Sequence, residues 1–237
     1  MLFLHELHEV VGKREEEFEA LIRDEWMPRL ARSRGARLLY FLHHAHGSGA
    51  SYRVVTITAI RDGACWGELV REVADGPLRA LAESLDRLRH DVRAKILIPL
   101  PWSPVQQIGF DEIPSDGRSH ELSIFMEDTV WPFEGLLEDY VKRSGAHYAE
   151  EMRRQREGGG RHLLTVDASF RTAYGSGRRR EIVLWQKIVQ QKALGPLLLS
   201  EVPAEYKKPG TWMHDGLALR DQWESRLLRT SAWSPWY

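Results

Sequence analysis

The tripeptide Trp-Ser-Pro occurs twice in this chain of 237 residues, at 102–104 and again at 233–235. The two copies lie 131 positions apart (233 minus 102). Two further landmarks recur in the same order: His-Glu-Leu at 5–7 and 120–122, and Ala-x-Gly-Ser-Gly at 45–49 and 173–177. Three landmarks repeated in one order indicate an internal duplication, and the increasing offsets (115, then 128, then 131) indicate insertions in the second copy.

Each half has the same succession of strand and helix patterns. Short alternating or β-branched runs predict strands, apolar residues at helical spacing predict helices, and glycines between two strand runs predict a hairpin. In the first half the expected order is strand 2–10, helix 13–35, hairpin 36–46 and 51–60, helix 77–92, and strand 94–101. In the second half it is strand 120–126, helix 132–157, hairpin 162–173 and 180–189, a proline-interrupted helical region 190–224, and strand 226–233.

The order βαββαβ predicts an α+β chain made of two tandem ferredoxin-like units. Such a unit covers one face of its sheet with helices and leaves the other face bare. Two bare faces in one chain can pack against each other, which predicts an internal pseudo-dimeric α/β barrel around a shared interior. The expected boundaries are 1–105 for the first domain, 106–118 for a linker rich in turn-forming residues, and 119–237 for the second domain.

Composition excludes several classes of partner. The 33 basic and 34 acidic side chains give a net charge of −1, which does not favour nucleic acid. No apolar run approaches the length of about 20 residues that crosses a bilayer, so no membrane partner is expected. The single cysteine, Cys65, cannot form a disulfide within the chain, and we expect a cytoplasmic protein. No phosphate loop, dinucleotide fingerprint or zinc spacing is present.

Several segments resemble the NIPSNAP family, a branch of the dimeric α/β-barrel superfamily. In the first half these are HELHEVV, LYFLHHAHG, YRVVTIT and AKILIPLPWSPV; in the second they are HEL, YGSG, EIVLWQKI and ESRLLRTSAWSP. The resemblance implies tandem NIPSNAP-like domains, in a superfamily that includes cofactor-free monooxygenases, isomerases, cyclases and haem enzymes. The chain departs from the family at Thr56 and Thr58, where a His and a Trp are usual.

Strand alternation selects the candidate catalytic residues. In the second half, Leu122, Ile124 and Met126 are expected to meet the helices, which directs Glu121, Ser123 and Phe125 into the shared interior. The matching interior set in the first half is Leu4, Glu6 and His8. Burial raises the pKa of an unpaired carboxyl, so Glu6 and Glu121 are candidate general bases and His8 is a candidate proton partner. The alternative is that each is satisfied by a neighbouring side chain and takes no part in chemistry.

A second set of residues is expected to bind substrate. His43 and Arg171 align in the two halves near the expected cavity mouth, Trp185 offers an aromatic wall, and Ser123 and Phe125 complete the interior face. The cluster at 43–46, His-His-Ala-His, is more typical of structural or exposed histidines than of ligands. No metal site and no cofactor is therefore predicted.

Three functions remain open. The first is an enzyme that binds a small hydrophobic or aromatic molecule between the two sheets and uses acid/base residues for cofactor-free oxygenation, isomerisation or cyclisation. The second is a non-catalytic NIPSNAP-like binding or scaffold protein. The third is a haem or metal protein that uses His8, His43 or His44. A homodimer through the helical faces is expected in addition.

Overall fold

One closed antiparallel barrel of eight strands forms the centre of the molecule. The computed structural model describes residues 1–33, 35–158, 162–175, 179–199 and 201–237. The strand order around the barrel is β1-β3-β2-β8-β5-β7-β6-β4. The strands are β1 (Leu2–Val10), β2 (Ala36–His44), β3 (Arg53–Ile60), β4 (Arg89–Pro99), β5 (Ile124–Trp131), β6 (Leu164–Tyr174), β7 (Ile182–Ile188) and β8 (Gln222–Thr230).

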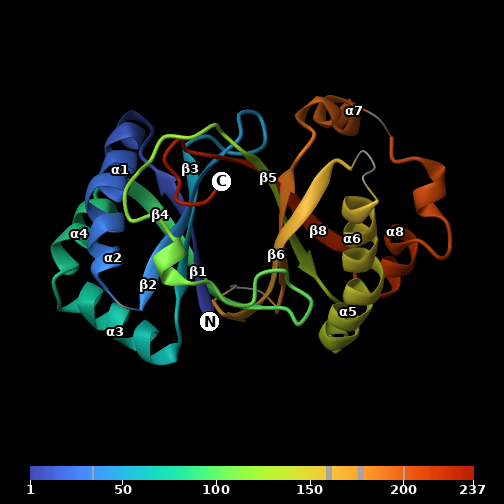
Figure 1. Ribbon diagram of the computed structural model, residues 1–237, viewed down its shortest axis with the longest axis horizontal. Coiled ribbons are helices and arrows are strands. Elements are labelled where there is room, and N and C mark those ends of the chain that lie inside the picture. The colour runs from blue at the N-terminus through green and yellow to red at the C-terminus, as the bar shows by residue number, and fades with distance from the viewer. Residues whose placement is uncertain (34, 159–161, 176–178, 200) are drawn as a thin grey trace.

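Helices cover the barrel on two opposite sides, so the chain is α+β (Figure 1). The first side carries α1 (Glu15–Leu21), α2 (Met27–Arg32), α3 (Gly63–Ala74) and α4 (Arg79–Asp86). The second side carries α5 (Leu137–Ser144), α6 (Glu150–Glu157) and α8 (Trp212–Asp215), with α7 (Leu194–Leu199) at the edge. A π-helical turn follows α1 at Ile22–Trp26, and another follows α5 at Gly145–Ala149. The prolines expected to interrupt 190–224 leave only short helices there, and β8 begins earlier than expected, at Gln222.

The strands of each half lie side by side in the barrel. The first half contributes β4-β1-β3-β2 and the second contributes β8-β5-β7-β6. Two short ladders close the circle: β2 pairs with β8 at residues 42–44, and β4 pairs with β6 at residues 96–99. The β2–β3 connection turns at Gly47, whose φ of 81° suits glycine. Parts of the corresponding loop (Ser176, Gly177) and of the glycine run after α6 lie outside the described residues.

The repeated Trp-Ser-Pro turns join the two halves. Ser103 Oγ, after β4, accepts a hydrogen bond from the Ser169 N–H on β6 at 2.9 Å. Ser234 Oγ, after β8, accepts one from the Phe41 N–H on β2 at 3.1 Å. All four residues are buried, at 5% exposure or less. The serine of each motif therefore satisfies a buried amide of the other half.

The tryptophans of the two turns also form hydrogen bonds with the opposite half. Trp102 Nε1 donates to the Val141 carbonyl on α5 at 2.9 Å. Trp233 Nε1 donates to Glu19 on α1 at 2.5 Å. Each ring thus contacts the first helix of the opposite half.

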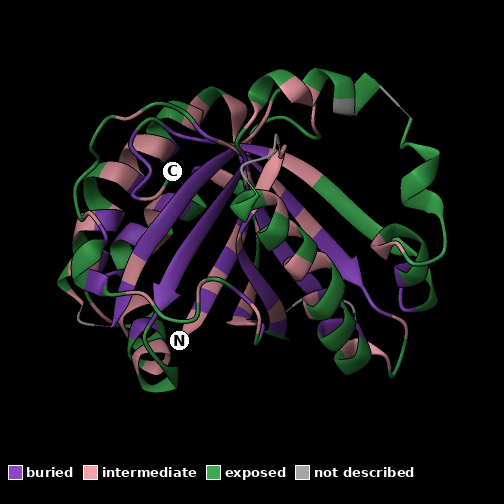
Figure 2. Ribbon diagram, turned by 45° about the vertical axis from the view of Figure 1, so that its right-hand side comes forward, coloured by how far each residue is buried: buried purple, intermediate pink, exposed green. Residues whose placement is uncertain are grey.

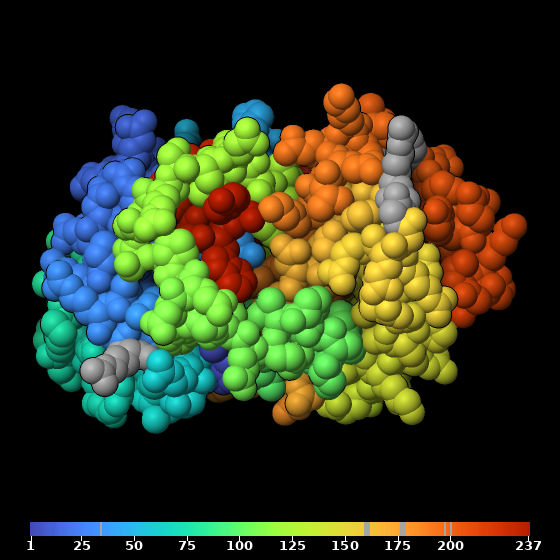
Figure 3. Space-filling model, viewed as in Figure 1, coloured from blue at the N-terminus to red at the C-terminus, as the bar shows by residue number. Residues whose placement is uncertain are grey.

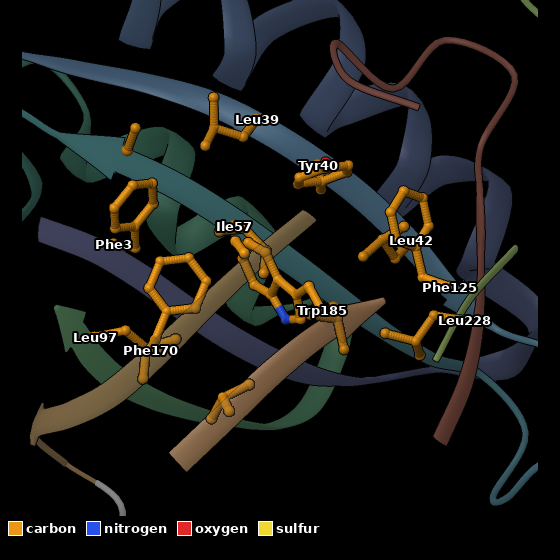
Figure 4. Close-up of a cluster of buried hydrophobic side chains, with 14 of the residues drawn as sticks. Phe3, Leu39, Tyr40, Leu42, Ile57, Leu97, Phe125, Phe170, Trp185 and Leu228 are labelled. Carbon is orange, nitrogen blue, oxygen red and sulfur yellow. The ribbon is translucent and has the colours of Figure 1, made fainter. Parts of the chain in front are cut away.

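Buried residues occupy the barrel interior and the layers between the sheet and the helices (Figure 2). Figure 4 shows the interior cluster, in which Phe3, Tyr40, Phe125, Phe170 and Trp185 converge from five strands. The outer layer of the first half is a separate core around Phe18, Ile22, Leu30, Phe41, Leu69 and Leu85. A smaller core under α5 contains Tyr140, Val141 and Leu184.

The prediction of which β1 residues face the barrel interior is wrong, because the interior residues are shifted by one position. Phe3 and Leu7 belong to the interior cluster, whereas Leu2 and Leu4 pack against the core under the helices. Glu6 and His8 therefore face the helices as well. The pattern misled because both faces of this strand are covered, and so both carry apolar residues.

In the described part of the chain, no helix has the length and apolar character needed to span a membrane.

Candidate functional site

A cavity of about 310 Å³ lies between the four strands of the first half (β4-β1-β3-β2), called the first sheet below, and the helices that cover them. Its floor is the outer face of β1, β3 and β4, and its walls come from α3, α4 and the π-helical turn after α1. The apolar lining consists of Leu4, Ile22, Trp26, Trp66, Leu69, Val70, Val73, Ala74, Ala82, Leu85 and Ala94. Four polar residues share the cavity: Glu6, His8, Thr56 and Arg89. An apolar enclosure with a few convergent polar groups is typical of small-molecule sites.

The four polar residues form one chain of hydrogen bonds with a fixed direction. Arg89 Nη1 lies 2.8 Å from His8 Nδ1, and a guanidinium can only donate, so His8 Nδ1 accepts. The ring proton of neutral His8 is then on Nε2, which donates to Thr56 Oγ1 at 2.9 Å. Thr56 Oγ1 in turn donates to Glu6 Oε2, at the longer distance of 3.4 Å. The chain therefore ends with a donor directed at the Glu6 carboxyl.

The environment shifts both titratable groups at this floor. Burial raises the pKa of Glu6, although the Arg89 charge and the Thr56 hydrogen bond oppose the shift. Burial, followed by the nearby charge of Arg89, lowers the pKa of His8 well below its usual value. His8 is consequently neutral at pH 7, as the direction of the hydrogen-bond chain requires. Glu6 is a stronger base than an ordinary glutamate when it is ionised.

Local sequence positions the walls. Asp62 caps α3 by accepting the Cys65 N–H at 2.9 Å, which starts the helix that carries Trp66. The π-helical turn widens the first long helix at Ile22–Trp26 and places Ile22 and Trp26 at the cavity. Turns of this kind are frequent at functional sites. The indole rings of Trp26 and Trp66 therefore line the same apolar cavity as the carboxyl of Glu6.

The second half has a carboxyl at the matching strand position but closes the space around it. Asp128 follows Glu127, which faces Trp185 on β7, just as Glu6 follows His5, which faces Ile57 on β3. Ser225 Oγ and Gln186 Nε2 both donate to the Asp128 carboxylate, at 2.5 and 2.8 Å. Tyr148 fills the adjoining volume and donates to Gln186. The carboxyl of Asp128 is therefore held by neighbouring side chains, whereas Glu6 lines an open cavity.

Three residues predicted from the sequence lie away from this cavity. Glu121 is exposed and precedes β5, so its expected interior position is wrong. His43 contacts Glu15 and Glu19 on α1 through its two ring nitrogens, at 3.2 and 3.1 Å, instead of lining a cavity mouth. Arg171 donates to Glu138 at 2.8 Å on the outer surface of the second half.

The predicted aromatic residues do lie inside the barrel. Phe125 and Trp185 are buried there, and Trp185 Nε1 donates to Glu127 Oε2 at 3.1 Å. His5 Nε2 donates to the same oxygen at 2.8 Å, and both members of this pair are buried. Ser123 is buried immediately before β5, where its N–H donates to Thr230 Oγ1. The structure thus separates these interior residues from Glu6 and His8 by the thickness of the sheet.

Sequence reasoning missed Thr56 and Arg89. In the sequence Thr56 stands out only as a departure from the resembling family, whereas in the structure it pairs directly opposite Glu6 and lies beside that carboxyl. Arg89 begins β4, within a segment expected to be helical, and this hid its approach to His8.

The histidines offer little to a metal ion. His8 and His43 use both ring nitrogens in hydrogen bonds to protein groups. Both nitrogens of His44 are buried without a hydrogen-bond partner. Among the described residues, no three side chains of His, Cys, Asp or Glu gather in a way that could hold a metal.

The fold is shared with several solved structures. An anthrone oxidase-like protein superposes with a TM-score of 0.62 at 8% identity, covering 97% of this chain and 91% of that one. A "putative monooxygenase" from Lactobacillus acidophilus NCFM gives a TM-score of 0.58 at 9% identity, covering 96% and 93%. A NIPSNAP domain protein from Burkholderia xenovorans matches at 20% identity over 44% of this chain and 99% of that one, with a TM-score of 0.36.

No protein-family model and no curated protein matches the sequence. The dimeric α/β-barrel fold implied by the sequence resemblance is confirmed by the closed barrel and by the similar solved structures. At these identities the likeness concerns the fold alone.

Proposed function

We propose that the protein binds a small hydrophobic or aromatic molecule in the cavity beside Glu6 and catalyses a cofactor-free reaction that begins with proton removal by Glu6. Oxygenation is the first candidate, and isomerisation and cyclisation start from the same step. The ligand would lie in the layer between the first sheet and its helices, and not between the two sheets as the sequence predicts. Glu6 and His8 keep the base and proton-partner roles expected of them, and Glu121 loses its role.

The directed chain from Arg89 through His8 and Thr56 to Glu6 carries this proposal. It engages Glu6 Oε2, and no described residue hydrogen-bonds Glu6 Oε1. An apolar structural layer has no need of a carboxyl held in this way, and burying an incompletely paired one is costly. A ligand that gives up a proton to Glu6 leaves a neutral carboxylic acid, which the apolar surroundings favour.

The names of two similar structures suggest the chemistry. Anthrone carries an acidic CH₂ group between two aromatic rings, and its carbanion reacts with oxygen without a cofactor. The overall reaction is anthrone (C14H10O) plus O₂ giving anthraquinone (C14H8O2) plus water. Glu6 would remove the first proton, and Trp26 and Trp66 would flank the flat rings. A volume of about 310 Å³ lies at the lower end for ligand sites and suits a small ring system.

We also infer that the chain consists of two tandem ferredoxin-like units, 1–105 and 119–237, connected by 106–118. The equivalent strand orders of the two halves support this inference. Its consequence for function is an asymmetric pseudo-dimer, in which Glu6 lines an open cavity in the first unit and Asp128 is held by Ser225 and Gln186 in the second. Dimerisation through the helical faces stays a prediction that sedimentation analysis would test.

The test is oxygen consumption and anthraquinone absorbance with purified protein, anthrone and air. Glu6→Gln should lower kcat by at least 100-fold while KM changes little, because the amide has the same shape but cannot accept the proton. Glu121→Gln is the matched control, since Glu121 is an exposed glutamate, and it should leave the rate unchanged. The wild-type rate should rise with pH through the raised pKa of Glu6 and then level off.

Three outcomes decide between the alternatives. Full activity in Glu6→Gln would refute the role of the base. Anthrone binding that is lost in Trp66→Ala, without turnover in the wild type, would support the non-catalytic binding protein instead. Activity that depends on added haem or metal would support the third function.

A further inference from the structure

A second cavity, of about 380 Å³, lies at one end of the barrel and does not include Glu6. Six aromatic side chains line it: Phe3, Tyr40, Phe170, Trp185, Trp236 and Tyr237. Figure 4 shows the first four of these converging within the barrel. Figure 3 shows the C-terminal residues, in red, beside the green linker segment at this face. The last residues of the chain and the linker therefore form the rim of this cavity.

The rings contact one another edge to face. Tyr40 lies 5.6 Å from Trp185 at 74° and 6.1 Å from Trp236 at 90°. Phe170 lies 4.8 Å from Trp185 at 70°. Contacts of this type hold aromatic side chains in defined orientations. The wall is consequently an ordered aromatic surface.

Asp167 is the acidic residue in this wall. It sits at a β-bulge in the β6–β7 ladder, between Val166 and Ala168. The β2–β3 ladder has a bulge at the matching place, between Leu38 and Tyr40, and there the extra residue is Leu39, which is buried in the interior cluster. A bulge inserts one additional residue into a strand, and in the first half the side chain of Leu39 fills the corresponding position. The barrel does not need a carboxylate here.

The Asp167 carboxylate has no ion pair or hydrogen bond within the described residues. Burial raises its pKa to about 6, although the charges of Lys187 and Arg156 oppose the shift. Lys187 Nζ is held by the Tyr237 carbonyl at 2.8 Å and lies 5.9 Å from that ring. Arg156, on α6, is exposed at the rim. Among the described residues, no cationic side chain pairs with this partly desolvated anion beside the aromatic rings.

We propose that this cavity binds a small organic ammonium ion, with Asp167 as its counter-ion and the aromatic side chains as its walls. Aromatic faces carry negative potential and attract cations, most strongly when water is excluded. A carboxylate at the same place adds a full charge. An alkylammonium ligand gains from both groups, whereas a neutral molecule of the same shape gains only from apolar contact. This site is independent of the reaction proposed at Glu6.

The probe pair is choline and 3,3-dimethylbutan-1-ol, which has the same shape with carbon in place of the charged nitrogen. Titration calorimetry at pH 7.5 and fixed ionic strength should show choline binding at least tenfold more tightly. Asp167→Asn should weaken choline binding at least tenfold and leave the alcohol unchanged. Asp75→Asn, a change at an exposed aspartate, is the matched control and should alter neither affinity.

Two further measurements separate charge from shape. Lowering the pH to 5 should weaken choline binding about tenfold, because a carboxyl of pKa about 6 is then mostly neutral. Trp236→Leu should weaken choline binding more than alcohol binding. Thermal unfolding of each variant checks that it folds. Equal affinities for the two probes, no choline binding by the wild type, or undiminished binding by Asp167→Asn would each overturn the proposal.

Discussion

The buried pair of His5 and Glu127 gives a quantitative test of how the barrel interior is held. His5 Nε2 donates to Glu127 Oε2 at 2.8 Å, and the two side chains are 3% and 1% exposed. Burial by itself would raise the pKa of Glu127, but the charges of His5, Lys95 and Arg226, together with the His5 hydrogen bond, hold it below its usual value. Glu127 is therefore an ionised carboxylate in the core, and His5→Leu would remove its shortest hydrogen bond.

Removing one partner of a buried pair costs about 3–5 kcal/mol, because the other charge stays buried. Here Trp185 Nε1 still donates to Glu127 at 3.1 Å, so the lower value applies. For a chain of this length, about 3 kcal/mol corresponds to a fall in Tm of roughly 6–12 °C. Replacing both residues by leucine removes the charge itself and leaves mainly the indole N–H unpaired, at about 1–3 kcal/mol. The double variant should therefore lose less stability than the sum of the two single variants.

The assay is thermal and urea unfolding at pH 7, followed by circular dichroism. His90→Leu is the control, because His90 is exposed on β4 and its replacement should change stability by about 0.5 kcal/mol or less. A Tm for His5→Leu within about 2 °C of that control, or strictly additive single and double variants, would show that the pair does not stabilise the barrel as argued.

Two further predictions concern stability. Ser103→Ala and Ser234→Ala should each destabilise the protein by about 1–3 kcal/mol in urea unfolding, because each leaves a buried amide N–H of the other half unpaired; no loss in either variant would mean that water replaces the hydroxyl. His44 has its pKa lowered to about 4 by burial and by Arg226, so the unfolded chain binds a proton near pH 6.5 that the folded protein does not. Stability should thus fall as the pH drops from 6.5 towards 4, and His44→Leu should reduce this dependence when unfolding is compared at pH 7 and pH 4.5; an identical pH dependence in that variant would contradict the assignment.

The fold could be predicted from the sequence because its signals are redundant. Hairpins, amphipathic helices and the repeated turns all indicated the same order of elements. Two of the three repeat offsets agree with the structure. The amides of Phe41 and Ser169, which play the same role in the two halves, are 128 positions apart. The hydroxyls that accept from them, on Ser234 and Ser103, are 131 positions apart. The offset of 115 does not, since His5 and Glu127 correspond at 122 (127 minus 5).

The site could be predicted only in part. The position of the second His-Glu-Leu, outside β5, explains the error at Glu121. The second His-Glu-Leu ends before β5 begins at Ile124, so Glu121 lies outside the strand register and in solvent. Glu6 and His8 were grouped correctly by strand alternation, but alternation cannot say which face is interior when helices cover one face and a second sheet covers the other. Thr56 and Arg89 come from other strands, and only the pairing of those strands with β1 brings them close.

Each Trp-Ser-Pro turn binds a buried amide of the opposite half, so each half needs the other to satisfy its hydrogen bonds. A fragment ending within 106–118 would retain the serine that serves the missing half while losing the one it needs, and its outer strands β2 and β4 would present unpaired edges. Separately produced fragments should consequently aggregate when alone and assemble with each other when mixed. In such a molecule, a substitution at position 234 acts directly on the backbone amide of residue 41, nearly two hundred positions away, so the two ends of the chain depend on each other for stability.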